Sequence, residues 1–384
     1  MRLVCEKNKC TACSACIEIC PKKAIHIEDS FAVCEAVIDE NKCINCGLCK
    51  QVCQVYHPLP SKMPIQWIQG WSNNELIRER ASSGGLATAI MLAFIKSGGV
   101  VYSCCLCEGE FQYSKASSLE EVYKFCGSKY VKSSPCKAYT QITADLKKQR
   151  KVLIVGLPCH IAGIKKYVEE TLQENLYTVD LICHGTPSPR VLELFLRQHG
   201  YSLEQVDGIL FRLKGNFCDY HDRFTSIETL GSYDKYSFAF MESISQTENC
   251  YSCQYASEKR ISDLTLGDSW GSEIEQKERE KGINLALCNT LKGKELINSA
   301  DLKLIPIDYT SAIKHNAQLH GPPQRGRARE KFFEKIQRGA DFDFIIWKIR
   351  PQLCAKSVVK KLLIRLGFIK KGTIYSIALP MNRQ

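Results

Sequence analysis

Two cysteine runs of identical spacing lie within the first 53 residues of the chain. The first run consists of Cys10, Cys13, Cys16 and Cys20. The second run consists of Cys43, Cys46, Cys49 and Cys53. The dipeptide Asn-Lys precedes the first cysteine of each run, so the segment is an internal repeat with an offset of 33 residues. A segment of about sixty residues buries little apolar surface, so metal bound by these thiolates must organise its fold.

The spacing within each run indicates which metal centre it holds. Structural zinc sites usually take cysteines as two separated pairs, whereas each run here is a triplet followed by a fourth cysteine. Such runs are typical of bacterial-type ferredoxins, where three cysteines hold one [4Fe–4S] cluster and the fourth binds the other. We therefore assign to one cluster, site 1, residues Cys10, Cys13, Cys16 and Cys53. We assign to the other, site 2, residues Cys43, Cys46, Cys49 and Cys20.

One residue departs from the usual run. Gln54 stands where proline commonly follows the last cysteine, as Pro21 follows the first run. That proline shapes a turn and is not a ligand, so the assignment to iron–sulfur clusters is kept.

The whole chain has the composition of an intracellular globular protein. It has 384 residues, 45% of them hydrophobic, which is enough for two or three domains. No apolar segment of a signal peptide follows the first residues, and the longest apolar stretch, Leu86–Ile95, is about half a membrane span. We expect a cytoplasmic protein whose 22 cysteines are reduced. Basic residues interleaved with stacking aromatics are not found, which argues against nucleic acid as a partner.

The net charge of +11 is concentrated at the C-terminus. Residues 350–384 contain eight Lys or Arg and no acid, whereas residues 1–60 are neutral. The segment Val358–Leu366 has the pattern of a basic amphipathic helix, which could contact an anionic membrane surface or an acidic partner. The alternative is a helix docked on the protein with a solvated basic face.

The sequence divides into three parts. Residues 1–60 form the small two-cluster domain, 65–345 a larger domain after a proline-rich linker, and 346–384 a basic extension. Helices and strands do not alternate strictly in the larger part, so the fold class is α+β with a mixed α/β second domain. We expect a helix over Gly84–Ser97, and strands over Val100–Tyr102, Lys151–Val155, Leu176–Ile182 and Ile261–Leu266.

Twelve further cysteines lie beyond residue 100, and most read as small buried hydrophobes. Four differ, because Cys159 and Cys183 each follow an expected strand, and Cys250 and Cys253 form a C-x2-C pair. The carboxyl ends of strands are where α/β folds place their chemistry. These four thiols, site 3, could hold a third cluster or a zinc ion, or could be ordinary buried cysteines.

The segment Ser82–Gly85 precedes the expected helix over Gly84–Ser97. Serine caps and two glycines at a helix N-terminus suit phosphate binding, because exposed N–H groups face the anion and glycine lets it approach. An ordinary helix N-cap is the alternative.

Taken together, several segments resemble the beta subunits of coenzyme F420 (deazaflavin) hydrogenases and dehydrogenases. Relatives of that family include formate dehydrogenase beta subunits and a plant chlorophyll reductase. The matching segments occur in the order of the family: Ser82–Gly85, Gly127–Val131, Val155–Cys159, Asp180–Gly185, and Cys250–Cys253 followed by Asp263 and Asp268.

The resemblance implies FAD in the large domain, with a [4Fe–4S] cluster at site 3. It places Ser82, Ser83, Gly84 and Gly85 at the FAD phosphates, with Lys129 and Tyr130 nearby. It also gives Asp263 and Asp268 a role in orienting flavin or ligand. The alternatives are a solvated surface lysine at 129 and ordinary turn residues at the two aspartates.

We therefore expect an iron–sulfur flavoprotein oxidoreductase that passes electrons between a ferredoxin-type carrier and a small organic acceptor. His184, beside a site 3 cysteine, is the candidate proton donor; a histidine that hydrogen-bonds its own loop is the alternative. A second hypothesis is an electron-transfer subunit that serves a hydrogenase or dehydrogenase partner and has no substrate of its own. A third is a zinc-stabilised interaction protein.

Overall fold

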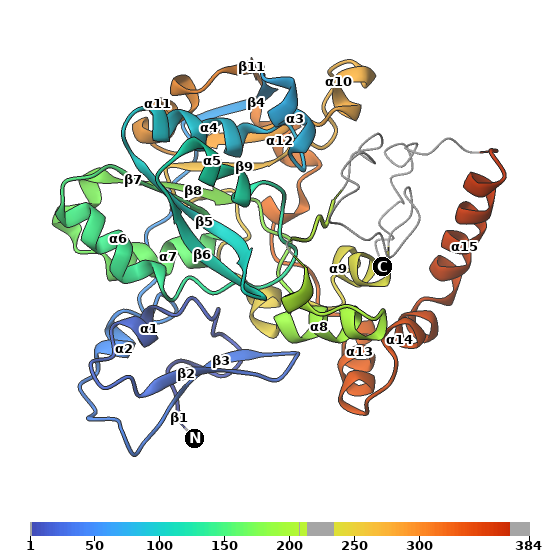
Figure 1. The fold of residues 1–384 in the computed structure, drawn as a ribbon, viewed down its shortest axis with the longest axis horizontal. Coiled ribbons are helices and arrows are strands. Elements are labelled where there is room, and N and C mark those ends of the chain that lie inside the picture. Colours follow the sequence, from blue (N-terminus) through green and yellow to red (C-terminus); the bar gives the residue numbers. More distant parts are fainter. Residues whose placement is uncertain (1, 207, 213–233, 369–384) are drawn as a thin grey trace.

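An eight-stranded sheet forms the centre of the large domain in the computed structural model (Figure 1), which describes residues 2–206, 208–212 and 234–368. The strand order is β11-β4-β10-β9-β8-β7-β5-β6. The four central strands β5, β7, β8 and β9 run parallel, and the outer neighbours pair antiparallel. In sequence order the strands are β4 (Gln66–Ser72), β5 (Val100–Cys107), β6 (Glu110–Ala116), β7 (Val152–Gly156), β8 (Leu176–Leu181), β9 (Leu264–Asp268), β10 (Asn284–Cys288) and β11 (Leu302–Pro306).

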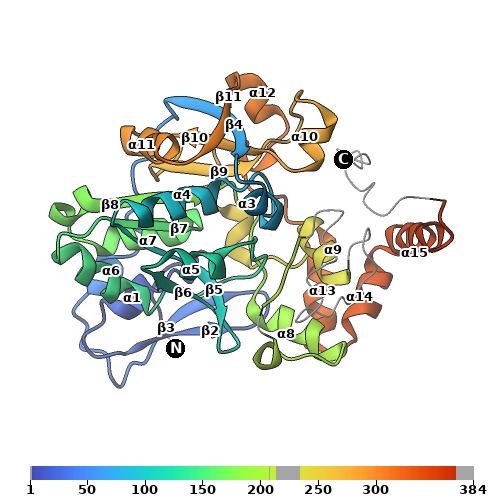
Figure 2. The ribbon, with the colours of Figure 1, turned by 45° about the horizontal axis from the view of Figure 1, so that its top comes forward.

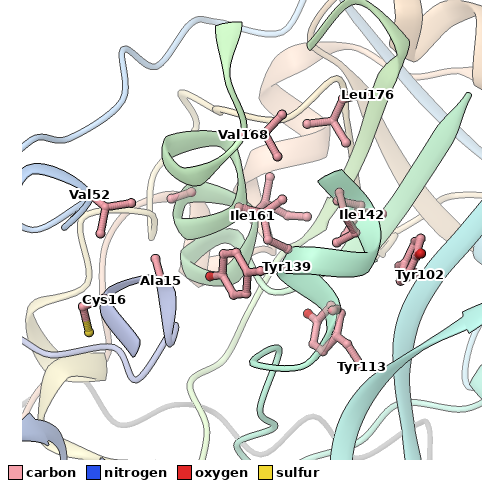
Figure 3. Close-up of a cluster of buried hydrophobic side chains, with 14 of the residues drawn as sticks. Ala15, Cys16, Val52, Tyr102, Tyr113, Tyr139, Ile142, Ile161, Val168 and Leu176 are labelled. Carbon is pink, nitrogen blue, oxygen red and sulfur yellow. The ribbon is translucent and has the colours of Figure 1, made fainter. Parts of the chain in front are cut away.

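Helices cover both faces of this sheet. On one face α4 (Leu86–Lys96) and α11 (Leu291–Ser299) pack their apolar sides against β7, β8 and β9. On the other face lie α6 (Ala138–Lys147) and α7 (Pro158–Tyr167). Figure 3 shows Tyr139 of α6 beside Ala15 of the N-terminal domain, and Ile161 of α7 and Val52 belong to the same buried cluster. One hydrophobic core therefore extends from the sheet through α6 and α7 into the small domain.

The N-terminal domain contains a three-stranded sheet of order β1-β3-β2 and two short helices. Its elements are β1 (Arg2–Leu3), α1 (Ala15–Glu18), β2 (Ile25–Asp29), β3 (Cys34–Ile38) and α2 (Leu48–Gln51). The 33-residue repeat is visible in the backbone, because α1 and α2 begin 33 residues apart and each follows a residue with a left-handed φ, 65° at Ser14 and 79° at Gly47. The two cysteine-containing loops thus have the same local structure.

A group of helices beside the sheet encloses a separate apolar cluster. Its members are α8 (Pro189–Gln198), α9 (Lys235–Met241), α13 (Arg327–Gln337) and α14 (Phe342–Ile349). From α14 the helix α15 (Pro351–Arg365) projects away from the rest of the chain (Figures 1 and 2). Its apolar Val358, Val359 and Leu362 are exposed.

The remaining short helices lie in the connections. They are α3 (Glu75–Arg80), α5 (Leu119–Val122), η1 (Tyr123–Phe125), η2 (Glu170–Asn175), η3 (Leu203–Gln205), η4 (Glu248–Ser252), α10 (Gln276–Glu280), α12 (Tyr309–Lys314) and η5 (Ala317–Leu319).

The architecture is the mixed one that the sequence predicts. A small N-terminal domain is followed in the sequence by a large domain built on a mixed sheet covered by helices. The expected helix is α4, and the expected strands are β5, β7, β8 and β9, although β9 begins three residues later than predicted, at Leu264. The expected domain boundary at residue 345 falls inside α14, where Ile345 and Ile346 are both buried in the helical cluster. A helix occupies the predicted basic segment, and its contact with a membrane or an acidic partner stays a prediction. In the described ranges, no helix is both long enough and apolar enough to span a membrane.

Candidate functional site

The four cysteines assigned to site 1 converge on one cavity of the N-terminal domain. Its lining includes Cys10, Cys13 and Cys16 of the first run, and Cys53 from the end of the second. The fold therefore brings Cys53, the fourth cysteine of the second run, to the first three cysteines of the first run, as the run pattern predicts. A fifth thiol, Cys5, lines the same cavity and was not anticipated from the sequence.

Backbone N–H groups point at the sulfur atoms of both runs. The N–H of Ala12 donates to Cys10 Sγ at 3.5 Å, and 33 residues later the N–H of Asn45 donates to Cys43 Sγ at 3.4 Å. Ala12 and Asn45 hold left-handed φ values of 55° and 54°, which are uncommon for residues other than glycine. Such strain persists where the surroundings impose it, commonly at functional sites, and N–H donors to sulfur are one means of setting a cluster's potential.

Site 2 lies at the surface of the small domain. Cys46 is exposed, and Cys43 and Cys49 are half-buried. Burial raises the pKa of the Cys49 thiol, and the neighbouring Cys43 and Cys46 raise it further. The Arg2 guanidinium donates to Cys43 Sγ at 3.0 Å. The fourth predicted ligand, Cys20, accepts the N–H of Ala24 at 3.4 Å.

Site 3 gathers four thiols from three separate segments. Cys159 stands in the first turn of α7, Cys183 follows β8, and Cys250 and Cys253 lie in and directly after η4. Burial raises the pKa of Cys159 well above its ordinary value, with contributions from Cys253, Cys183 and Cys250. Burial likewise raises the pKa of Cys183 to about 12. A metal centre at site 3 would have to displace the protons of Cys159 and Cys183.

A buried ion pair fixes two of these segments relative to each other. Arg260 Nη2 lies 3.0 Å from Asp180 Oδ1, and both side chains are almost fully buried. Arg260 also donates to the carbonyl of Leu181, near Cys183, and to the carbonyl of Tyr255, near Cys253. The guanidinium therefore holds the loop after β8 and the loop after Cys253 in one arrangement.

Sites 1 and 3 are joined by a hydrogen-bonded network. Gln54, fully buried, donates through Nε2 to Thr11 Oγ1 at 2.9 Å. Its Oε1 accepts from Gln254 Nε2 at 2.8 Å and from the Tyr255 hydroxyl. Because Gln54 follows Cys53 and Gln254 follows Cys253, the network connects a site 1 ligand peptide to a site 3 ligand peptide.

The donor sets of sites 1, 2 and 3 consist of thiols alone, which are the ligands of [4Fe–4S] clusters and of four-cysteine zinc sites. Across the described residues, no three His, Cys, Asp or Glu side chains converge closely enough to hold one metal ion. A zinc ion needs four ligands at about 2.0–2.3 Å from one centre, and in a cubane each of the four thiolates binds a different iron. At site 3 a buried polar atom, Nε2 of His160 beside Cys159, also has no hydrogen-bond partner among the described residues.

The segment predicted to bind phosphate, Ser82–Gly85, lies at the start of α4. Its serines do not cap the helix but form hydrogen bonds to other segments. Ser82 Oγ accepts the N–H of Ser128 at 2.7 Å, and Ser83 Oγ donates to the carbonyl of Ile283. The expectation that serine caps the helix is wrong, because the N-cap is Gly85 and Asn284 Oδ1 accepts the N–H of Leu86 instead. The Ser82–Ser128 bond nevertheless brings together two of the segments that the resemblance assigns to FAD.

The fold itself requires glycine at positions 84 and 85. A Cβ at Gly84 would stand 2.6 Å from the carbonyl oxygen of Gly70 in β4, and Gly85 has a left-handed φ of 87°. Glycine is therefore required for α4 to start this close to the sheet.

Lys129 and Tyr130 lie beside this segment. The Lys129 ammonium donates to the carbonyls of Phe125, Cys126 and Gly127, at 2.7–2.9 Å, and so closes its own loop. The Tyr130 ring stacks on Phe240 with centroids 4.5 Å apart. The alternative of a solvated lysine does not describe Lys129, and its part in FAD binding stays a prediction.

The two predicted aspartates lie at opposite ends of β9. Asp268 is at the carboxyl end, where Arg212 Nη1 approaches it at 2.7 Å. Asp263 precedes the strand, and its carboxylate accepts from the N–H and Oγ1 of Thr178 and from Thr290 Oγ1. The structure does not bring the pair together, and the bonds of Asp263 hold β8, β9 and the start of α11 in place.

His184 is surrounded by hydrogen-bond partners. Its Nε2 lies 3.2 Å from the carbonyl of Met241 and 3.0 Å from Ser243 Oγ, and Gln318 Nε2 lies 2.5 Å from its Nδ1. Burial lowers the pKa of the imidazole below its ordinary value. A neutral ring engaged on both nitrogens matches the alternative of a loop-holding histidine, and proton donation stays a prediction.

The sequence reading missed two buried residues, one in contact with the loops of sites 1 and 3 and one in the cavity of site 1. Lys132 follows the matched segment Gly127–Val131 directly and is 4% exposed. Cys5 lies five residues before the first run, and its thiol lowers the pKa of Cys53 to about 6 by hydrogen bonding. Neither residue belongs to a motif, so only their placement in space identifies them.

Similarity to known proteins is found among solved structures and among family models. None of the curated proteins matches the chain. One similar solved structure is a xenon derivative of the F420-reducing [NiFe] hydrogenase complex from Methanosarcina barkeri. The matching chain is 18% identical to this one, and the TM-score is 0.47. The match covers 72% of this chain and 95% of that chain.

Three family models match the sequence. The 4Fe-4S dicluster domain matches residues 9–56. The N-terminal and C-terminal models of the coenzyme F420 hydrogenase/dehydrogenase beta subunit match residues 67–139 and 149–307. The two beta-subunit matches together cover more than half of the 384 residues, and the chain belongs to the coenzyme F420 hydrogenase/dehydrogenase beta subunit family, with a 4Fe–4S dicluster domain at its N-terminus.

Proposed function

We propose that the chain is an iron–sulfur flavoprotein oxidoreductase that passes electrons between a ferredoxin-type carrier and an organic acceptor. Sites 1, 2 and 3 would each hold a [4Fe–4S] cluster, and the segment Ser82–Gly85 with Ser128 and Lys129 would hold FAD. When bound, the clusters supply one-electron transfer and the flavin couples it to two-electron chemistry, which side chains cannot do.

The observation that carries this proposal is the order of the three thiol sets in space. Site 2 lies at the surface, with Cys46 exposed and the neighbouring Ile44 57% exposed. Site 1 lies against the large domain, where the Tyr139 hydroxyl of α6 donates to the carbonyl of Cys13. Site 3 belongs to the large domain and is joined to site 1 through Gln54 and Gln254. This order supports a surface entry for electrons and an inner destination.

The chain's own residues support the inner sites in two ways. Apolar packing by Tyr139, Ile161 and Tyr255 keeps water away from the junction of the two domains. The ion pair of Arg260 with Asp180 holds the ligand loops of site 3 in one arrangement. Rigid and dry surroundings are what a metal centre needs for a defined potential.

Metal analysis tests the proposal. Anaerobically purified protein should contain about 12 iron atoms, four for each [4Fe–4S] cluster, together with acid-labile sulfide and FAD. Cys250→Ser should lose about four iron and retain the rest, whereas the control Cys354→Ser, a buried cysteine in the helical cluster, should retain all of them. About eight iron in the unaltered protein, or full iron in Cys250→Ser, would contradict the assignment of site 3. Colourless protein that contains zinc would favour the zinc-stabilised interaction protein.

The second candidate function is an electron-transfer subunit with no substrate of its own. The family description, a beta subunit, favours it, and the exposed surface around Ile44 at site 2 would then face another subunit of a hydrogenase or dehydrogenase. Isolated protein distinguishes the two functions. Turnover of deazaflavin, a quinone or an unsaturated or carbonyl metabolite with reduced ferredoxin supports the enzyme, and reduction of the cofactors without any turnover supports the subunit.

A further inference from the structure

We propose that Lys132 is the shared counter-charge of sites 1 and 3, a positioning residue that raises the reduction potential of a cluster at either site. The inference rests on the proposed function, because it assumes that site 3 holds a cluster. It adds a residue that no motif or family match assigns.

The geometry places one residue against the ligand loops of both sites. The Lys132 N–H donates to the carbonyl of Pro187, at 2.8 Å, in the loop that carries Cys183. The Lys132 ammonium donates to the carbonyl of Thr11, at 3.4 Å, in the loop between Cys10 and Cys13. A single side chain therefore crosses the boundary between the two domains.

Thiols of both sites are among the electrostatic neighbours of the Lys132 ammonium. The groups that interact with its ammonium are Cys250 and Cys159 of site 3, Cys10 of site 1, and the buried Cys34. None of these partners, within the described residues, is a carboxylate. A buried ammonium without a negative partner is costly. A [4Fe–4S] cluster with four thiolate ligands has a net negative charge, so clusters on both sides would supply the missing partner.

Other lysines with little exposure have a different environment. The Lys129 ammonium is satisfied by three carbonyls of its own loop. Lys165 of α7 donates to the carbonyl of Ile261 and interacts with the carboxylates of Asp263 and Asp180. Lys132 thus differs from both in facing two metal sites.

The expected effect follows from Coulomb's law. Reduction adds one electron to a cluster, and a fixed positive charge nearby favours the reduced form, more strongly in a dry interior than in water. Removal of the charge should therefore lower the potentials of sites 1 and 3 and leave the surface site 2 unchanged. A tenfold loss in the equilibrium constant for reduction corresponds to about 59 mV for one electron.

The test is a redox titration of the full chain, followed by electron paramagnetic resonance. Signals are first assigned by their loss in Cys53→Ser, Cys46→Ser and Cys250→Ser. Lys132→Gln should then lower the equilibrium constant for reduction of sites 1 and 3 by about tenfold or more. The iron content and the potential of site 2 should not change. Lys132→Arg, which keeps the charge, and the control Lys165→Gln should leave all three potentials close to those of the unaltered protein.

Each remaining outcome is decisive. Unchanged potentials in iron-replete Lys132→Gln overturn the inference. If Lys132→Gln and Lys132→Met fail to load sites 1 and 3 while Lys132→Arg loads them, the charge is required and the inference holds. If Lys132→Arg also fails to load them, the role of Lys132 is in packing and the inference is overturned. Failure of the proposed function gives a different result. In that case the unaltered protein would have no site 3 signal, which is the signal that Cys250→Ser is expected to remove.

Discussion

The side-chain oxygen of Gln54 accepts a hydrogen bond from the hydroxyl of Tyr255, which lies 201 residues later in the sequence. Gln54 directly follows the last cysteine of site 1, and Tyr255 lies two residues after the last cysteine of site 3. Proline, the usual residue at this place in such a run, has no side-chain amide and could form none of these bonds. The departure from the run pattern is therefore where the small N-terminal domain and the large domain are joined.

Replacement of Gln54 by alanine should loosen this junction. The change leaves Thr11, Gln254 and Tyr255 without their buried partner, which should cost about 1–3 kcal/mol. Denaturant unfolding measures this cost, and stopped-flow reduction should show slower electron arrival at site 3 with iron content unchanged. Gln51→Ala, at an exposed position of α2, is the matched control. Equal stability and equal rates in the two variants would show that the network does not hold the domains.

The crossing of ligands between the two runs predicts which variants share a phenotype. Cys53→Ser should lose the same cluster signal as Cys10→Ser, because both residues line the cavity of site 1. Cys20→Ser should instead lose the signal that disappears in Cys46→Ser. Cys5→Ser should retain about all of the iron, since the run pattern leaves Cys5 outside the ligand set. Pairing of Cys53 with Cys46 in these spectra would refute the crossed assignment.

The sequence was most informative where spacing reflects a physical constraint directly. Metal geometry fixes the intervals of the cysteine runs, and burial on both faces of a sheet produces the continuous apolar run of β7. Less was visible where the partner is distant. Asn284 caps α4 from 198 residues away and replaces the serines that looked like caps. Lys132 reaches Thr11 across 121 residues. Such contacts arise from the packing of two domains, which no local pattern records.

The outer strands of the sheet were also not visible in the local sequence pattern. β4 and β11 pair with each other at the edge of the sheet although their sequences, QWIQGWS and LKLIP, lack a continuous apolar run. Similarly, Asp263 and Asp268 are close in sequence and looked equivalent, but the length of β9 separates them. Their different hydrogen bonds could be assigned only from the register of β8 and β9.

The ion pair of Arg260 with Asp180 predicts a selective loss of site 3. Asp180→Asn leaves the buried guanidinium without its countercharge, and breaking a buried pair in this way costs about 3–5 kcal/mol. We expect the variant to lose about four iron atoms and to keep the spectra of sites 1 and 2. The control Glu169→Gln breaks the exposed pair of Glu169 with Lys147, and such pairs contribute about 0–1 kcal/mol. Retention of full iron in Asp180→Asn would show that the pair is not needed to arrange the ligands.

Asp145 of α6 predicts an acid-dependent contribution to stability. Burial would raise the pKa of this carboxyl, but hydrogen bonds from Lys115 and Tyr102 outweigh it and hold the pKa below its ordinary value. The unfolded chain then binds a proton more readily than the folded one, so the stabilisation is present above about pH 4 and is lost as the pH falls further.

Asp145→Asn should accordingly lower the free energy of unfolding near neutral pH by about 1–3 kcal/mol. The difference from the unaltered protein should shrink as the pH falls below about 4. Thermal or denaturant unfolding at several pH values measures it. A difference that stayed constant across this range would mean that the charge of Asp145 contributes nothing.

Removal of iron should unfold the N-terminal domain and spare the opposite face of the sheet. The small domain has only short elements around its two metal loops, so the bound metal provides much of its folding free energy. The cluster formed by α4, α11 and the central strands contains none of the assigned ligands. The cluster beneath α6 and α7, in contrast, includes Ala15, Cys16 and Val52 of the small domain. Hydrogen exchange after chelation should therefore show lost protection in residues 2–56, partial loss in α6 and α7, and retained protection in α4. Equal loss in α4 and α6 would mean that the two faces of the sheet unfold as one unit.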